Sequence, residues 1–245
     1  MPRRPNQVGQ TPTSPPDKRR YVRAIFSDIA PRYDLLNRVL SLNIDQSWRR
    51  RAVARLEWQR RPGGTYLDAC AGTLDLAVML AGQRGFAGRV IATDFAVPML
   101  RLGGAKAREL EVRRVAADTL SLPLPDASMD GAIVGFGVRN LADLDLGLRE
   151  LARVIRAGGR LVVLDFATPA FAPLRALYLL YFRRVLPLVG RIVSGHPTAY
   201  QYLPDSVLEF PAPEVLASRL AGAGFKSCAY QLLTGGIAAV TWGER

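Results

Sequence analysis

The chain is poor in the residues that bind metals and form disulfides. Its 245 residues include one histidine, His196, and two cysteines, Cys70 and Cys228, which lie too far apart to form a metal-ligand motif. The sequence therefore predicts no metal site. So little cysteine is typical of a protein from a reducing compartment, which favours the cytoplasm.

Long apolar runs are also missing. No stretch of about 18 uncharged apolar residues occurs, so no transmembrane helix is predicted. Residues 1–20 are polar, proline-rich and basic, and they lack the apolar centre of a secretory signal. They are predicted to form a disordered tail, which leaves residues 21–245 as one large domain.

Acidic residues are the minority among the charges, with 21 against 33 basic residues and a net charge of +12. Such a balance permits nucleic acid or an anionic membrane as a partner, although an arginine-rich proteome explains it more simply. The chain lacks the N/D-P-P-Y/F motif of enzymes that methylate amino groups of nucleic acids. It also lacks an appended RNA-binding module and a stripe of basic residues interleaved with aromatics, so nucleic acid is not expected as a partner. The sequence does not determine the oligomeric state, and a homodimer is one of the states that it allows.

Apolar strands and amphipathic helices alternate from residue 65 onward, which predicts an α/β fold with a doubly wound, mostly parallel sheet. The segments before and within this pattern differ from it: residues 21–60 have helical spacing, and residues 169–211 form an apolar, basic and aromatic insertion. We expect both to act as lids, the second on the substrate side. Strands are predicted at 65–70, 89–94, 112–118, 131–136, 160–166, 225–233 and 236–243, with a helix at 213–223.

Three successive predicted strands end in an acid: Asp68, Asp94 and Asp118. The carboxyl ends of parallel strands form the ligand crevice of an open sheet, and an acid placed like Asp94 binds ribose hydroxyls in nucleotide folds. Each acid could instead cap a helix. The first turn has one glycine, Gly72, where a dinucleotide fingerprint has three, so a pyrophosphate is not favoured. S-adenosylmethionine has no phosphate, and its sulfonium cation suits the three acids.

Residues 131–168 predict a further strand–helix–strand unit, with Arg139 and Asn140 directly after its first strand. This places the two side chains at the same crevice, where they can orient a polar ligand. They could equally cap the helix that follows.

With these residues the chain resembles the ubiquinone/menaquinone C-methyltransferases, class I enzymes that methylate a quinol ring carbon. Its first block is similar to F-x-x-x-A-x-x-Y-D-x-x-N-x-x-x-S with W-R-R, and its second to F-G-x-R-N with R-V-x-x-x-G-G-R-L. The third block is YQYLPDSVLEFP, followed by AGF and LTGGIAAV. The three blocks begin at residues 26, 135 and 200.

The resemblance implies S-adenosylmethionine as cofactor and a prenylated quinol as substrate, most closely the conversion of demethylmenaquinol to menaquinol. Arg139 and Asn140 would be catalytic, by stabilising a phenolate or orienting a water that takes the ring proton, with His196 as an alternative base. The alternatives are a non-catalytic homologue, or an enzyme for ubiquinone precursors or another small molecule. The implied cofactor-binding residues are Asp68, Gly72, Thr73, Asp94, Asp118, Thr119 and Gly135, and the implied substrate-binding residues are Tyr33, Asn37, Tyr200 and Tyr202.

The chain departs from the family pattern at three positions. Leu74 replaces a glycine of the first loop, where a positive φ would cost a leucine roughly 1–2 kcal/mol. Its side chain is also expected to crowd the methionine part of the cofactor. Ala117 replaces another glycine, and Thr241 stands where the family often has histidine.

The segment 172–195 is apolar and carries four arginines. It could lie on an anionic membrane with the arginines extended toward the headgroups, which would suit a substrate with an isoprenoid tail. It could equally form a buried helix pair over the active site.

Overall fold

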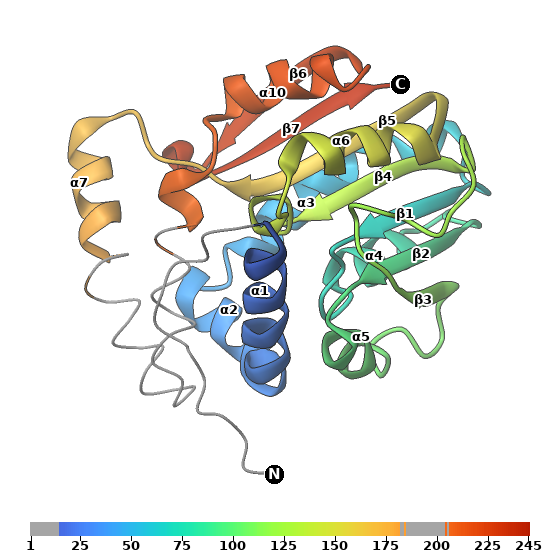
Figure 1. Ribbon diagram of the computed structural model, residues 1–245, viewed down its shortest axis with the longest axis horizontal. Helices are drawn as coiled ribbons and strands as arrows, with labels where there is room; N and C mark the ends of the chain where they lie inside the picture. The colour runs from blue at the N-terminus through green and yellow to red at the C-terminus, as the bar shows by residue number, and fades with distance from the viewer. Residues whose placement is uncertain (1–14, 182–183, 185–203, 205) are drawn as a thin grey trace.

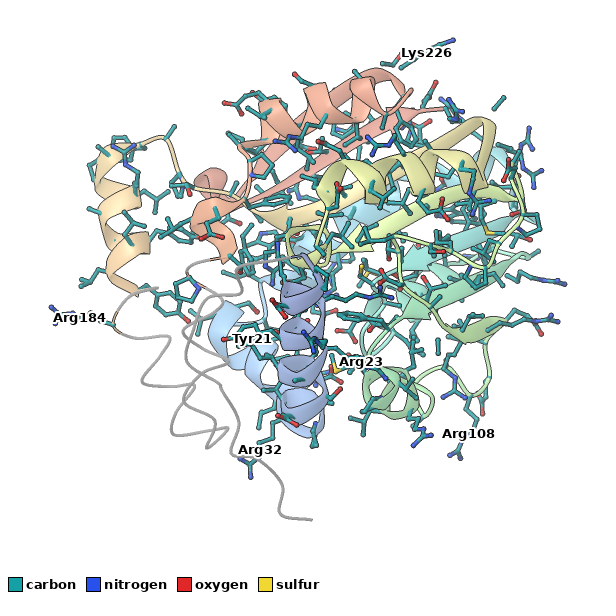
Figure 2. All side chains as sticks on the ribbon, in the orientation of Figure 1. Tyr21, Arg23, Arg32, Arg108, Arg184 and Lys226 are labelled. Atoms are coloured by element: carbon teal, nitrogen blue, oxygen red, sulfur yellow. The ribbon has the colours of Figure 1, made fainter. Side chains whose placement is uncertain are left out.

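The protein is built on one seven-stranded sheet in the order β3-β2-β1-β4-β5-β7-β6. The computed structural model describes residues 15–181, 184, 204 and 206–245 (Figure 1), and Figure 2 adds side chains as sticks in the same orientation. Among the described strands, β7 alone runs opposite to the other six, so the predicted doubly wound, mostly parallel sheet is confirmed. The strands are β1 (Thr65–Ala69), β2 (Arg89–Asp94), β3 (Val112–Ala116), β4 (Met129–Gly135), β5 (Ile155–Phe166), β6 (Lys226–Leu233) and β7 (Ala238–Glu244).

Helices cover both faces of the sheet because alternate side chains of the central strands point to opposite faces. Ile133 of β4 packs in the cluster that holds α3 and α4, whereas Val134 packs in the cluster that holds α6 and α10. Figure 1 shows α6 and α10 on the same side of the sheet. The helices are α3 (Asp45–Arg55), α4 (Asp75–Ala81), α5 (Val97–Gly103), α6 (Leu144–Val154) and α10 (Pro213–Gly222).

Two further helices precede α3, namely α1 (Pro15–Ile29) and α2 (Tyr33–Ser41). The prediction of a tail over residues 1–20 is therefore wrong from residue 15 onward. A proline at the start and Asp17 in the first turn favour a helix, and Val22 is buried on its inner side. Helix α1 packs against α5, at the end of the sheet where the parallel strands finish (Figure 1).

The expected substrate-side insertion is described in part. It begins with α7 (Ala172–Leu180), which stands apart from the sheet in Figure 1. His196, Tyr200 and Tyr202 lie outside the described residues. Within the part of the chain that the structure describes, none of the helices is long and apolar enough to cross a membrane.

Candidate active site

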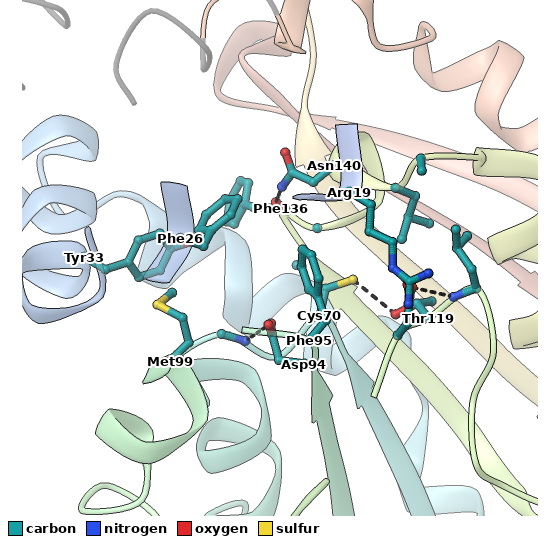
Figure 3. A pocket seen from close by; sticks show the side chains of 17 residues that line it. Arg19, Phe26, Tyr33, Cys70, Asp94, Phe95, Met99, Thr119, Phe136 and Asn140 are labelled. Carbon is teal, nitrogen blue, oxygen red and sulfur yellow. Dashed lines mark hydrogen bonds and ion pairs between the residues drawn. The ribbon is translucent and has the colours of Figure 1, made fainter. Parts of the chain in front are cut away.

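A pocket opens where β1, β2 and β4 end, and α1 and α2 form its outer wall (Figure 3). It encloses about 660 Å³ of empty space, with the solvent at its open mouth included. Many of the residues expected from the sequence line this pocket. They are Gly72, Asp94, Asp118, Thr119 and Gly135 of the cofactor set, Tyr33 of the substrate set, and Asn140 of the catalytic pair.

Asp94 ends β2 and is held by the backbone on both sides. Its Oδ2 accepts a hydrogen bond from the Gly72 amide and its Oδ1 one from the Ala96 amide, each at 2.8 Å. Burial raises the pKa of Asp94, against the effect of these amide bonds. The Phe95 amide also hydrogen-bonds this carboxylate, which has about four acceptor positions and so keeps at least one for a hydroxyl group in the pocket.

Asp118 lies at the other end of the pocket, beneath α1. Its Oδ1 accepts from the Leu120 amide at 2.9 Å, and Arg19 Nε lies 2.5 Å from its Oδ2 as an ion pair. Next to it, the Cys70 thiol and the Thr119 hydroxyl are 3.3 Å apart. Burial raises the pKa of Cys70 to about 12, so the thiol stays protonated at neutral pH.

Asp68 is the acid that the structure separates from the other two, because it does not line the pocket. It is buried under α4, where its Oδ2 accepts from the Ala77 amide at 2.8 Å. The predicted cofactor contact is thus replaced by the helix-capping alternative. Burial raises the pKa of Asp68 to about 8.

Thr73 is also not among the residues that line the pocket, and it joins the first loop to the N-terminal helices. Its hydroxyl donates to Asp34 of α2 at 2.5 Å. Lys106 Nζ lies 2.5 Å from Asp34 and 2.6 Å from Asp75, and Arg49 lies 3.4 Å from Asp75. Burial raises the pKa of Asp34, but hydrogen bonds from Lys106 and Thr73 outweigh it and hold that pKa below its usual value. The network fixes α2 against the loop that carries Gly72.

Tyr33 begins α2 and forms part of the pocket wall. Burial raises the pKa of Tyr33, while a side-chain hydrogen bond with Asn37 acts in the opposite direction. Asn37 itself does not line the pocket, so it supports a pocket residue where a direct substrate contact was expected.

Leu74 has the positive φ expected from its place in the loop, with φ +70° and ψ +20°. The expected crowding of the cofactor is wrong, because its side chain is 0% exposed and belongs to the core beside Leu76 and Leu80. The Leu74 side chain fits there because α5 has a glycine, Gly103, at the contact. A Cβ at Gly103 would come within 2.5 Å of Leu74 Cγ. The side chain points into the core and leaves the pocket open.

Arg139 is buried directly behind the pocket wall. Its Nη1 donates to Asp165 Oδ1 at 2.8 Å and also to the Phe136 carbonyl, which accepts from Asn140 Nδ2 at 3.2 Å. The helix-capping alternative for this pair is wrong, since Asp143 caps α6 through the Leu146 amide.

The structure adds residues that the sequence did not single out. Arg19 and Phe26 come from α1, and Met99 comes from α5, so only the folded chain brings them to the pocket (Figure 3). Asp165 did carry a signal, because it is a further acid at the end of a central strand.

The chain is similar to known proteins over nearly its whole length. A family model described as the ubiE/COQ5 methyltransferase family matches residues 15–245. The chain belongs to this family. It is 50% identical to the demethylmenaquinone methyltransferase of Thermus thermophilus over 223 residues, which cover 90% of this chain and 100% of that protein. It is 46% identical to the protein of the same name from Deinococcus radiodurans, with 94% of each chain covered. The ubiquinone/menaquinone biosynthesis C-methyltransferase UbiE of Geotalea uraniireducens is 40% identical, with 94% and 98% covered.

Solved structures agree on the fold. A SAM-dependent methyltransferase of Thermotoga maritima, described as a possible histamine N-methyltransferase, superposes with a TM-score of 0.65 at 20% identity. The alignment covers 91% of this chain and 99% of that one. A Haloferax volcanii methyltransferase, solved with its Trm112 activator, gives 0.66 at 15% identity, with 89% and 96% covered. The sheet is thus the class I methyltransferase fold.

Proposed function

We propose that the protein transfers a methyl group from S-adenosylmethionine to a ring carbon of a prenylated quinol, with demethylmenaquinol as its substrate. The observation that carries the proposal is the pocket at the ends of β1, β2 and β4 in a chain of this methyltransferase family. Relatives of 46% and 50% identity are named for demethylmenaquinone, which favours that quinol over a ubiquinone precursor.

The pocket residues fit S-adenosylmethionine, which would supply an electron-deficient methyl carbon. Asp94 retains acceptor capacity for a ribose hydroxyl, and the backbone amides around it fix the carboxylate in place. Asp118 and Thr119 border the end suited to the adenine. Gly72, at φ +52°, lets the backbone approach the ligand without a side chain between them.

The reaction requires an electron-rich ring carbon placed in line with the methyl group. Holding both substrates in one pocket contributes several kcal/mol to the lowering of the barrier. The Arg139 cation behind the wall favours the phenolate over the neutral phenol, and the phenolate directs charge onto the ring carbon. Asn140 lines the pocket and orients the polar groups of the substrate there.

The α7 surface favours contact with an anionic membrane, as the sequence pattern of this insertion suggests. Phe171, Leu177 and Leu180 are 69%, 63% and 55% exposed, in a segment that also carries arginines. Contact with the bilayer would place the pocket near a substrate with a long isoprenoid tail. Co-sedimentation with anionic vesicles tests this, and a Leu177→Ser/Leu180→Ser variant should lose the binding. Equal sedimentation with and without vesicles would refute it.

Calorimetric titration with S-adenosylmethionine and S-adenosylhomocysteine tests the proposed function, followed by methylation assays on demethylmenaquinol. We expect micromolar binding and a methylated quinol, and weaker binding to Asp94→Asn. Asp145→Asn is the matched control, because Asp145 pairs with Arg219 on the surface. Absence of binding to either ligand would favour the non-catalytic alternative.

A further inference from the structure

A buried ion pair stands next to the pocket without belonging to its wall. Arg139 follows β4 and Asp165 lies near the end of β5, and their side chains are only 6% and 3% exposed. Gly135 of the wall pairs with Leu164, and the Phe136 amide donates to the Leu164 carbonyl at 2.7 Å. This register places Asp165 beside Phe136. Phe136 lines the pocket, and Asp165 lies on the neighbouring strand.

The ion pair leaves one donor and one acceptor without a partner. Arg139 Nη1 bonds Asp165 Oδ1, which also accepts from the Phe166 amide at 2.9 Å. Arg139 Nε and Asp165 Oδ2 are buried and have no hydrogen-bond partner among the residues that the structure describes. A guanidinium and a carboxylate commonly pair through two parallel bonds, which would involve a second donor and Oδ2. Leaving a buried polar atom unbonded is costly, so both atoms can still take a hydrogen-bond partner.

A hydroxyl group would satisfy both atoms at once, since it can donate to Oδ2 and accept from Nε–H. The surroundings suit an aromatic hydroxyl. The Arg139 guanidinium carbon lies 5.4 Å from the centre of the Phe166 ring. Tyr178 of α7 is buried so close to the ion pair that both charges affect the pKa of its hydroxyl, Arg139 by lowering it and Asp165 by raising it. Since α7 belongs to the substrate-side insertion, the ion pair lies between the cofactor pocket and that insertion.

We propose that Arg139 and Asp165 bind a ring hydroxyl of the quinol and that Asp165 accepts its proton. This rests on the proposed function and assigns Asp165 a role in it. The O–H bond breaks and its proton moves to Oδ2, which leaves a phenolate that the Arg139 cation stabilises. The ring carbon then bonds the methyl group as the methyl–sulfur bond breaks, and the electron pair of that bond stays on sulfur. The ring carbon loses its own hydrogen as a proton to water, the ring becomes aromatic again, and the oxygen takes back the proton from Asp165. One proton is released per methyl transferred.

A base at Asp165 makes the turnover number depend on pH. Burial raises the pKa of Asp165, and the charge of Arg139 opposes this. The charged and titratable groups around the ion pair include Tyr178 from α7 and Lys18 from α1, whose Nζ donates to the Arg139 carbonyl at 3.3 Å. Tyr33 from α2 also interacts with the charge of Arg139, and Ala239 of β7 flanks Asp165 in the sheet. The turnover number should therefore rise with pH to a plateau as the carboxyl group loses its proton.

Asp165→Asn tests the proposal because it keeps the shape and removes the base. We expect the turnover number to fall by about 100-fold or more, the usual contribution of a positioned base. Affinity for S-adenosylhomocysteine should be unchanged, and the acid limb of the pH profile should disappear. Asp130→Asn is the matched control, since Asp130 is a buried, ion-paired acid at the opposite end of β4. It should lower the melting temperature without altering the pH profile.

An Asp165→Asn enzyme that retains the acid limb would overturn the proposal, however slow it is. Asp165→Glu provides a second test where the amide variant fails to fold, because it should retain part of the activity with a displaced acid limb. An unchanged limb in Asp165→Glu would also overturn it. The proposed function fails separately, if the unmodified protein does not methylate demethylmenaquinol.

Discussion

Replacing Leu74 by glycine should destabilise the protein even though it relieves backbone strain. The side chain is fully buried, and truncating a buried leucine costs about 2–5 kcal/mol. Glycine removes the strain of a left-handed leucine, about 1–2 kcal/mol. The difference predicts a net loss of about 0–4 kcal/mol in the free energy of unfolding, with about 2 kcal/mol as its midpoint.

Leu74→Ala separates the two contributions, because alanine loses the same packing and keeps the strain. The alanine variant should be less stable than the glycine variant by about 1–2 kcal/mol. Urea unfolding followed by circular dichroism measures both, provided that the slopes agree with that of the parent protein. Affinity for S-adenosylhomocysteine should change by less than about twofold in either variant, since the side chain points into the core.

Three results would refute this reasoning. A glycine variant more stable than the parent would show that Leu74 contributes no packing. Equal stability of the alanine and glycine variants would show that the left-handed backbone is not strained. About tenfold tighter ligand binding by the glycine variant would show that the leucine does crowd the cofactor.

Three further predictions concern the same end of the sheet. Gly103→Ala should lower the melting temperature by roughly 5 °C, because the methyl group would come within 2.6 Å of a backbone oxygen. Gly104→Ala, which meets mainly the end of a flexible arginine side chain, should lower it far less, and equal shifts would contradict the explanation. Because the pKa of Asp68 is raised to about 8, its contribution to stability is present below about pH 4 and is lost as pH rises toward 8. Asp68→Asn should flatten this decline in unfolding measurements at pH 5 and pH 8, and parallel declines in both proteins would argue against it. Arg19→Gln should release S-adenosylhomocysteine several-fold faster in stopped-flow experiments, because its ion pair ties α1 across the pocket. Arg20→Gln, whose ion pair is exposed, should leave the rate unchanged, and similar rates in all three proteins would show that α1 does not hold the ligand.

Much of the sheet could be predicted from local pattern alone. Each parallel strand is a short apolar run bounded by turns, and the segments between them have helical spacing, so the order of elements follows directly. The position of the site follows as well, because parallel strands end at one edge. Asp94 and Asp118 are therefore found in the pocket where the pattern predicts them.

Other parts of the site depend on contacts that no local pattern contains. Asp68 and Asp94 both end a strand, yet only the packing of α4 determines that one caps a helix and the other lines the pocket. The destination of the Leu74 side chain depends on Gly103 in another helix. Arg19 lies in a segment whose prolines and charges are typical of disorder, and its helix is stabilised by burial against the rest of the fold.

The strand order also determines which part of the sheet can unfold locally. In the described sheet β6 pairs only with β7, and β7 joins it to β5, so every hydrogen bond that holds the sheet's last edge passes through β7. Helix α10 packs on this same pair of strands. Amide protons of α10, β6 and β7 should therefore exchange with solvent together, as one cooperative unit that can detach while the strands around the pocket stay paired. The methyl-transfer site and this C-terminal unit would then differ in local stability within a single sheet.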